Sequence, residues 1–170
     1  MSSALEKGKI STSDTFVCDG GQAFGTDTFI KCAVWPNAHG TETLADVIAN
    51  SCNDGMMAIG RKMGAALLLD DQSRFNFGSR TGIDLPNESS GAIYTLDQMK
   101  DMELASTTFG QGFTSTMIQE ISAVSAVING GTYYQPHVVK EIKSQEDGSV
   151  LKTNEGNVLK QIVSSDVSEK

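Results

Sequence analysis

The chain is poor in several residue types, and each shortage excludes a class of protein. Three cysteines are too few for a small disulfide-rich scaffold, and no two of them have the C-x-x-C spacing of zinc and redox sites. Lysine and arginine number 13 against 21 aspartates and glutamates, which gives a net charge of -8, and no basic cluster offsets it. We therefore expect no metal, no cofactor and no binding of nucleic acid.

Long apolar runs are also missing. No stretch approaches the length that crosses a bilayer, and the opening residues MSSALEKG lack the basic and apolar regions of a secretion signal. The 170 residues, 39% of them hydrophobic, are enough for one ordinary domain with a core. We expect one compact, soluble unit.

The few cysteines and histidines leave two alternatives open. Cys18 and Cys32 flank a glycine-rich segment, so in an oxidising compartment a disulfide between them could close that loop and stabilise it by roughly 3 kcal/mol in the chain-entropy model. Two separate buried thiols fit the sequence equally well. His39 and His137 are isolated from each other and from any acidic pair, which favours surface or hydrogen-bonded histidines over metal ligands.

Short β-prone runs are separated by turn residues. Residues 15–18 and 28–34 predict a hairpin or a pair of edge strands. A second hairpin is predicted at residues 132–153, with its turn at Asp147–Gly148. Glycine and proline punctuate residues 70–103, where we expect loops.

Two helices have start signals of the capping-box type, in which two side chains and two backbone N–H groups bond reciprocally. The pairs are Thr43 with Asp46, after a predicted loop at residues 36–43, and Thr116 with Gln119. The second helix has one apolar face, so we expect it to pack in the core and to end at Gly130. That face is made by Met117, Ile121, Val124 and Ile128. Helices mixed with short antiparallel hairpins indicate an α/β fold of the α+β type.

The stretch TLADVIANSCNDGMMAIG, residues 43–60, predicts two helices interrupted at Ser51, Cys52 and Asn53. Serine and asparagine bond nearby backbone, so a turn with Ser51 or Asn53 capping the second helix is one explanation. The other is that this corner presents a hydroxyl and a carboxamide to a cleft, while Cys52 packs inward.

A series of segments occurs in the order and spacing of a known enzyme family. The segments are SALEKG, FVCDGG, IKC, HGTETLADVIANSCN, FGSRTGIDLPNESSG, LASTTFGQGFTSTMIQ and NGGTYYQPHVVKEI. They resemble the transpeptidase domain of class B penicillin-binding proteins, most of all Gram-positive division or sporulation members. The resemblance is strongest over residues 5–142, and residues 143–170 would add a hairpin and the start of a following helix to this partial domain, residues 1–170.

The resemblance implies a fragment of the penicillin-binding and β-lactamase-like transpeptidase fold, mainly its helical subdomain with short antiparallel hairpins. In this family an SxxK serine attacks the D-Ala-D-Ala end of a peptidoglycan stem peptide, β-lactams acylate the same serine, and SxN and KTG motifs complete the site. Ser51, Cys52 and Asn53 match SxN. The match implies proton transfer for Ser51, and binding of the substrate amide or orientation of the lysine for Asn53.

The nucleophile has no counterpart in the chain. Residues 2–7 resemble the tail of the SxxK helix and residues 163–170 the segment before KTG, so we expect both motifs to lie outside residues 1–170. SVLK at residues 149–152 matches SxxK by letter, but Ser149 and Lys152 fall on a predicted strand, whose alternating side chains face opposite ways. We expect this segment to be inactive alone, within a parent protein anchored at the extracytoplasmic face of the bacterial membrane.

Two other functions fit the sequence. One is a related serine β-lactamase or β-lactam sensor domain, and the other is a non-catalytic module that docks division or sporulation proteins through its acidic surface. An isolated segment of such a domain would also expose apolar faces, including that of residues 117–128, which favours self-association.

Overall fold

The computed structural model describes residues 1–170, and the chain forms two compact units. The first unit comprises Met1–Asp71, Ile93–Phe113 and Lys170, and the second comprises Gln72–Ala92 and Thr114–Glu169. The composition favoured one unit. It could not show the division, because each unit is assembled from separate segments of the chain.

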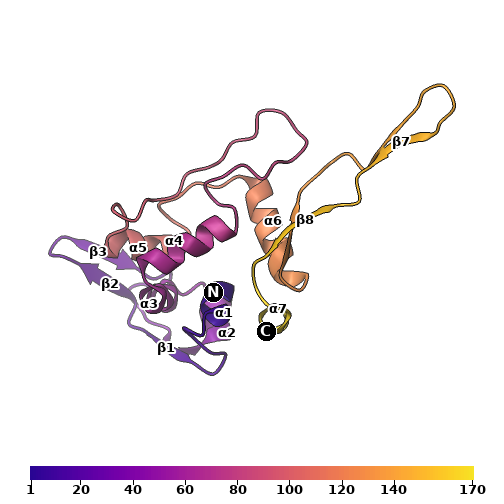
Figure 1. Ribbon diagram of the computed structural model, residues 1–170. Coiled ribbons are helices and arrows are strands. Elements are labelled where there is room, and N and C mark those ends of the chain that lie inside the picture. Colours follow the sequence, from indigo (N-terminus) through magenta and orange to yellow (C-terminus); the bar gives the residue numbers. More distant parts are fainter. The chain divides into compact units, whose positions relative to one another are not determined.

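The first unit alternates helices with two-stranded sheets (Figure 1). Its elements are α1 (Ser2–Glu6), β1 (Thr15–Cys18), β2 (Gly21–Phe24), β3 (Thr28–Lys31), β4 (Gly40–Thr43), α2 (Leu44–Ala49), α3 (Asn53–Met63), α4 (Ala65–Arg74, whose last residues belong to the second unit) and α5 (Asp101–Thr108). The two β-prone runs form edge strands β1 and β3, as one alternative predicted, but the hairpin between them is wrong. β2 pairs with β3, and β1 pairs antiparallel with β4, which lies in the segment expected to be a loop.

Helix α3 packs against α5, β1, α2 and α1. Two glycines on α3 allow neighbouring helices to come close. A Cβ atom on Gly55 would lie 2.5 Å from Cγ2 of the buried Val47 on α2, and one on Gly60 would overlap the methyl group of Thr108 on α5. The core around these contacts is formed by Ala4, Ile10, Phe16, Cys18, Cys32, Leu44, Val47, Cys52, Ile59 and Met63.

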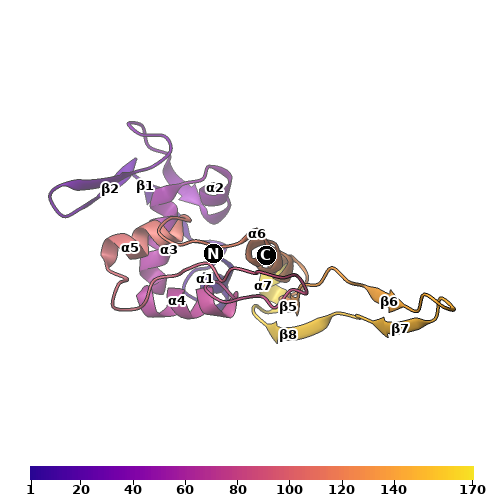
Figure 2. The ribbon, with the colours of Figure 1, turned by 90° about the horizontal axis from the view of Figure 1, so that it is seen from above.

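The second unit consists of two short helices and two further antiparallel pairs (Figure 2). The elements are α6 (Met117–Ile128), β5 (Thr132–Gln135), β6 (Glu141–Lys143), β7 (Val150–Thr153), β8 (Asn157–Gln161) and α7 (Ser165–Glu169). The predicted hairpin is confirmed for β6 and β7, which are joined through Asp147–Gly148, whereas β5 pairs with β8. Lys152 is exposed on β7 and Ser149 directly precedes that strand, so the SVLK letters do not form a helical SxxK motif.

Helix α6 begins with the predicted capping box of Thr116 and Gln119, but its buried face differs from the expected one. The apolar side chains assigned to the core, Met117, Ile121, Val124 and Ile128, are 81%, 58%, 57% and 74% exposed. The buried positions are Gln119, Ser122, Ala123 and Ala126. Small side chains let the helix lie close to its neighbours in this unit, and the bulky face is left in solvent.

The loop expected at residues 70–103 is confirmed for residues 75–100, but a helix extends into each of its ends. α4 continues to Arg74 and α5 occupies Asp101–Thr108, while residues 75–100 contain no further helix or strand apart from an isolated bridge between Ala92 and Thr114. The start of α5 has acidic residues in its first turn, which is a helix signal that the glycine and proline content of this region concealed. None of the helices combines the length and the apolar character needed to cross a membrane.

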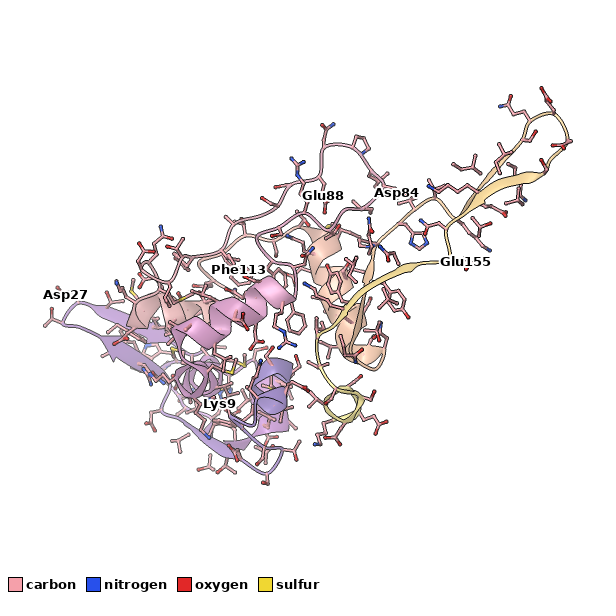
Figure 3. The ribbon with its side chains drawn as sticks, viewed as in Figure 1. Lys9, Asp27, Asp84, Glu88, Phe113 and Glu155 are labelled. Atoms are coloured by element: carbon pink, nitrogen blue, oxygen red, sulfur yellow. The ribbon has the colours of Figure 1, made fainter.

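Carboxylates hold the loop of the second unit in place, and Figure 3 labels two of them, Asp84 and Glu88. Glu88 accepts hydrogen bonds from the hydroxyl and N–H of Thr81, both at 2.6 Å, and from the N–H of Gly82 at 3.0 Å. Asp84 accepts from the N–H groups of Val138 and Val139, at 2.8 and 3.0 Å, and these bonds lower the pKa of that carboxyl.

Candidate active site

The predicted corner between two helices is present in the first unit. α2 ends at Ala49 and α3 begins at Asn53. Between them Ser51 has a φ of 50°, in the left-handed region that residues other than glycine seldom occupy. The N–H of Ser51 donates to the carbonyl of Ile48 at 3.1 Å, and the N–H of Cys52 to that of Val47 at 2.9 Å, so the end of α2 holds the corner.

The residue that caps α3 is Cys52. Its Sγ accepts a hydrogen bond from the N–H of Gly55 at 3.3 Å, and its side chain is fully buried, as predicted for this residue. Capping by Ser51 or Asn53 is therefore wrong. The hydroxyl and the carboxamide on either side of Cys52 are not used to satisfy the start of the helix.

The structure brings Ser51 and Asn53 to one rigid corner. Ser51 is exposed and Asn53 is half-buried. Nδ2 of Asn53 donates to the carbonyl of Lys31 at 2.9 Å, which ties the start of α3 to the end of β3. Nδ2 of Asn50 donates to Oε1 of Glu42 at 2.8 Å, which ties the end of α2 to β4. Strands thus hold the corner on both sides, which suits side chains that must keep a fixed position.

The first unit also contains an open cavity of about 900 Å³. It is lined by the β2–β3 turn region, by Arg61 of α3 and by residues 99–102 and 104, before and within α5. Ser51 and Asn53 are not among its lining residues. The predicted cleft at the corner is thus not this cavity.

A cluster of sulfur and imidazole groups lies directly beneath the corner. The ligand atoms of Cys18, Cys32, His39 and Cys52 all lie within 4.8 Å of one another. Sγ of Cys32 is 3.9 Å from Sγ of Cys52 and 3.7 Å from Nδ1 of His39. The cysteines are buried free thiols, so the disulfide between Cys18 and Cys32 is not formed in this structure.

The sequence did not indicate this cluster, and the prediction that His39 lies away from acidic groups is wrong. The four residues come from the end of β1, the residue after β3, the loop before β4 and the helix corner. Antiparallel pairing places Cys18 opposite Gly40, next to His39. That register was not predicted, because β4 was taken for a loop, and no short motif marks the set.

The surroundings affect the three thiols differently. Burial raises the pKa of Cys18 and of Cys52 above the ordinary value, and the nearby carboxylates of Asp54 and Glu42 act in the same direction. Burial also acts to raise the pKa of Cys32, but backbone N–H groups at the start of α3 outweigh it and lower the pKa of that thiol. Cys32 is therefore the thiol that ionises most readily.

Two buried carboxylates accompany the cluster, and neither forms an ion pair with lysine or arginine. Asp54, 1% exposed, accepts hydrogen bonds from the N–H groups of Asp19 and Gly20 at 3.1 and 3.0 Å. Glu42, 3% exposed, has Oε2 at 3.7 Å from Nδ1 of His39, and this oxygen accepts no hydrogen bond. The site is thus rich in electron-pair donors and poor in positive charge.

Comparisons with known proteins agree with the order of motifs. A family model described as the penicillin-binding protein transpeptidase domain matches residues 1–170. Stage V sporulation protein D of Bacillus subtilis (strain 168) is 35% identical over 170 residues, which cover 99% of this chain and 26% of that protein. Penicillin-binding protein PbpB of Mycobacterium tuberculosis is 29% identical over 106 residues, or 62% of this chain and 16% of that protein. The chain spans a minor part of the length of these relatives.

Solved structures show the same fold. Penicillin-binding protein 3 of Mycobacterium tuberculosis, in complex with aztreonam, matches with a TM-score of 0.85 and 26% identity over 99% of this chain and 37% of that chain. The D,D-transpeptidase domain of a peptidoglycan glycosyltransferase from Eggerthella lenta matches with a TM-score of 0.86 and 22% identity, over 98% of this chain and 43% of that chain. The predicted fold class, a part of the transpeptidase fold with helices and short antiparallel strands, is confirmed.

Proposed function

Because the chain belongs to the penicillin-binding protein transpeptidase domain family, we propose that it is part of a peptidoglycan D,D-transpeptidase. The parent enzyme would cross-link stem peptides of the cell wall through an acyl-serine intermediate, and penicillin would acylate the same serine. The observation that carries this proposal is the corner at residues 51–53. Its middle residue caps the helix and is buried, and this leaves the two flanking polar side chains available for chemistry.

The two side chains suit different tasks. The exposed hydroxyl of Ser51 can both accept and donate a proton, so it would relay the proton from the nucleophile and its lysine toward the leaving amine. Asn53 already uses Nδ2 on the carbonyl of Lys31, which leaves Oδ1 to accept a hydrogen bond from a substrate amide or from the lysine. The bond to Lys31 also fixes the direction in which Oδ1 points.

The rest of the catalytic set would come from polypeptide outside residues 1–170. These residues would form part of one transpeptidase domain, completed by a serine and lysine of an SxxK helix and by a KTG strand. The parent protein would be anchored at the extracytoplasmic face of the bacterial membrane. Similarity over the whole chain to a sporulation protein supports a sporulation role, with sporulation proteins as partners, over a role in division.

Labelling with a fluorescent penicillin tests the proposal. The chain alone should form no covalent adduct, and a longer protein that includes both flanking motifs should form one. In that protein Ser51→Ala should slow acylation by roughly two orders of magnitude or more, since a positioned proton-transfer group contributes about that much. Ser13→Ala, at another exposed serine of the first unit, is the matched control and should leave the rate unchanged. An unchanged rate in Ser51→Ala would refute the role of Ser51, and an adduct on the chain alone would refute an external nucleophile.

A further inference from the structure

The Cys18, Cys32, His39 and Cys52 cluster has the composition and spacing of a metal site, and we propose that it binds one zinc ion. The proposal reverses the expectation of no metal, which depended on spacing along the sequence. Folding brings the four ligands together from segments that are far apart in the chain.

The distances fit tetrahedral zinc. Zinc–sulfur bonds of about 2.3 Å and zinc–nitrogen bonds of about 2.0–2.1 Å place neighbouring ligand atoms about 3.6–3.8 Å apart in a tetrahedron. The measured separations are 3.9 Å between Sγ of Cys32 and Sγ of Cys52, and 3.7 Å between Sγ of Cys32 and Nδ1 of His39. The remaining separations stay within 4.8 Å, so a small inward movement of side chains completes the site.

The donor set selects the metal. Three thiolates and one imidazole favour zinc over magnesium and calcium, which prefer oxygen ligands. Four protein ligands close the coordination sphere, and this is typical of a structural rather than a catalytic zinc. The chain has three cysteines and two histidines in all, and the cluster uses every cysteine and one of the histidines.

The buried charge around the cluster points to a cation independently of the ligands. Glu42 is buried, has no lysine or arginine partner, and directs Oε2 to within 3.7 Å of Nδ1 of His39 without a hydrogen bond. An uncompensated carboxylate in the interior is costly, and a dication beside it would offset part of that cost. Because Oε2 lies beside Nδ1, the nitrogen that would bind zinc, Glu42 would act through its negative charge near the cation and not through a hydrogen bond to His39.

Zinc at this place would fix the corner that carries Ser51 and Asn53. Cys52 lies between these two residues, and its partners hold it to β1, to the residue after β3 and to the loop before β4. Cys52 is then a positioning residue, since zinc touches neither the substrate nor the reacting atoms. Metal binding itself does not depend on the proposed transpeptidase function, so each can fail without the other.

Metal analysis of the chain tests the site. Chain purified under reducing conditions should contain one zinc per molecule, and cobalt exchanged for zinc should give the sulfur-to-metal charge-transfer band and the intense visible bands of a tetrahedral thiolate site. His39→Gln and Cys18→Ser should lose both signals. His137→Gln removes the other histidine, which is exposed and lies in the second unit, and should keep them. Glu42→Gln should weaken zinc affinity by about 10-fold, because it removes a negative charge beside the cation.

Several results would overturn the proposal. They are the absence of stoichiometric zinc in folded wild-type chain, an iron–sulfur spectrum, octahedral cobalt bands, and equal zinc affinity in His39→Gln and His137→Gln. The wild-type metal content and cobalt spectrum decide the matter even if a cysteine variant does not fold. In a longer protein that reacts with penicillin, a chelator that removes zinc should slow acylation, whereas zinc bound without any effect on acylation would confirm the site and refute its role in positioning Ser51.

Discussion

The two units of the chain are stabilised in different ways. In the first unit the helices and strands enclose an apolar core into which three thiols project, with the buried carboxylates of Glu42 and Asp54 beside the thiols. In the second unit a glutamine is fully buried at α6, while large apolar side chains of the same helix face solvent. Apolar residues thus form most of the interior of the first unit, whereas at α6 of the second unit hydrogen bonds from side chain to backbone are the better guide to burial.

Loss of the buried glutamine should have the largest effect. Nε2 of Gln119 lies 3.1, 2.7 and 2.8 Å from the carbonyls of Asn76, Ser79 and Ser90, and Oε1 accepts from the N–H of Thr116 at 2.8 Å. Gln119→Leu would remove the side-chain partner of these part-buried groups. At about 1–3 kcal/mol for each unsatisfied group, we expect a loss of about 3–5 kcal/mol after partial relaxation.

Denaturant unfolding and hydrogen exchange measure this loss and locate it. Exchange should accelerate in the second unit, while α3 of the first unit stays protected. The control is Gln111→Leu at an exposed position, where the change should be within about 0.5 kcal/mol. Equal losses of unfolding free energy in Gln119→Leu and Gln111→Leu would show that the buried glutamine does not stabilise the second unit through its hydrogen bonds.

Features that depend on residues close together in the sequence were predicted well. Features that depend on contacts between distant segments were mostly missed. Both capping boxes were predicted because each depends on residues three apart, Thr43 with Asp46 and Thr116 with Gln119. The pairing of β1 with β4 was missed, because β4 has the composition of a loop and its partner is distant in sequence. The order of family motifs provided the fold class, which no single segment could have indicated.

The candidate site also has one part that the sequence predicted and one part that it did not. Ser51 and Asn53 were found because they form a short contiguous motif, and their roles remain predictions. The cap at Cys52 and the cluster of cysteines with His39 were missed, since both depend on where the strands place their ends. The absence of a spacing motif excludes only those metal sites whose ligands come from one short segment of the chain.

An intermediate effect is expected at Glu88. Burial alone would raise the pKa of this carboxyl, but hydrogen bonds from Thr81 and Gly82 outweigh it and lower the pKa. A group with a depressed pKa in the folded state contributes its stability above the unfolded pKa, about 4.3, and loses it as pH falls through the folded value. Glu88→Gln should therefore cost about 1 kcal/mol at neutral pH, a value reduced for solvent screening, and less in acid.

Chemical unfolding of the second unit between pH 7 and pH 3 measures this dependence. The wild type and Glu88→Gln should converge as the pH falls. Glu155→Gln, at an exposed carboxylate of the same unit, is the control and should change the free energy of unfolding at neutral pH by less than about 0.5 kcal/mol. Curves for Glu88→Gln that stay parallel to the wild type would mean that the carboxylate does not hold the loop.

The smallest effect is expected on the exposed face of α6. Ile121→Gln replaces a side chain that is 58% exposed, so the free energy of unfolding should change by less than about 0.5 kcal/mol. Ala126→Leu on the buried face of the same helix should cost about 1–3 kcal/mol, because Ala126 is 1% exposed and the added atoms have no space. If Ile121→Gln instead costs more than Ala126→Leu, and the cost grows with protein concentration, then a second copy of the chain covers this face and hydropathy governs burial in both units.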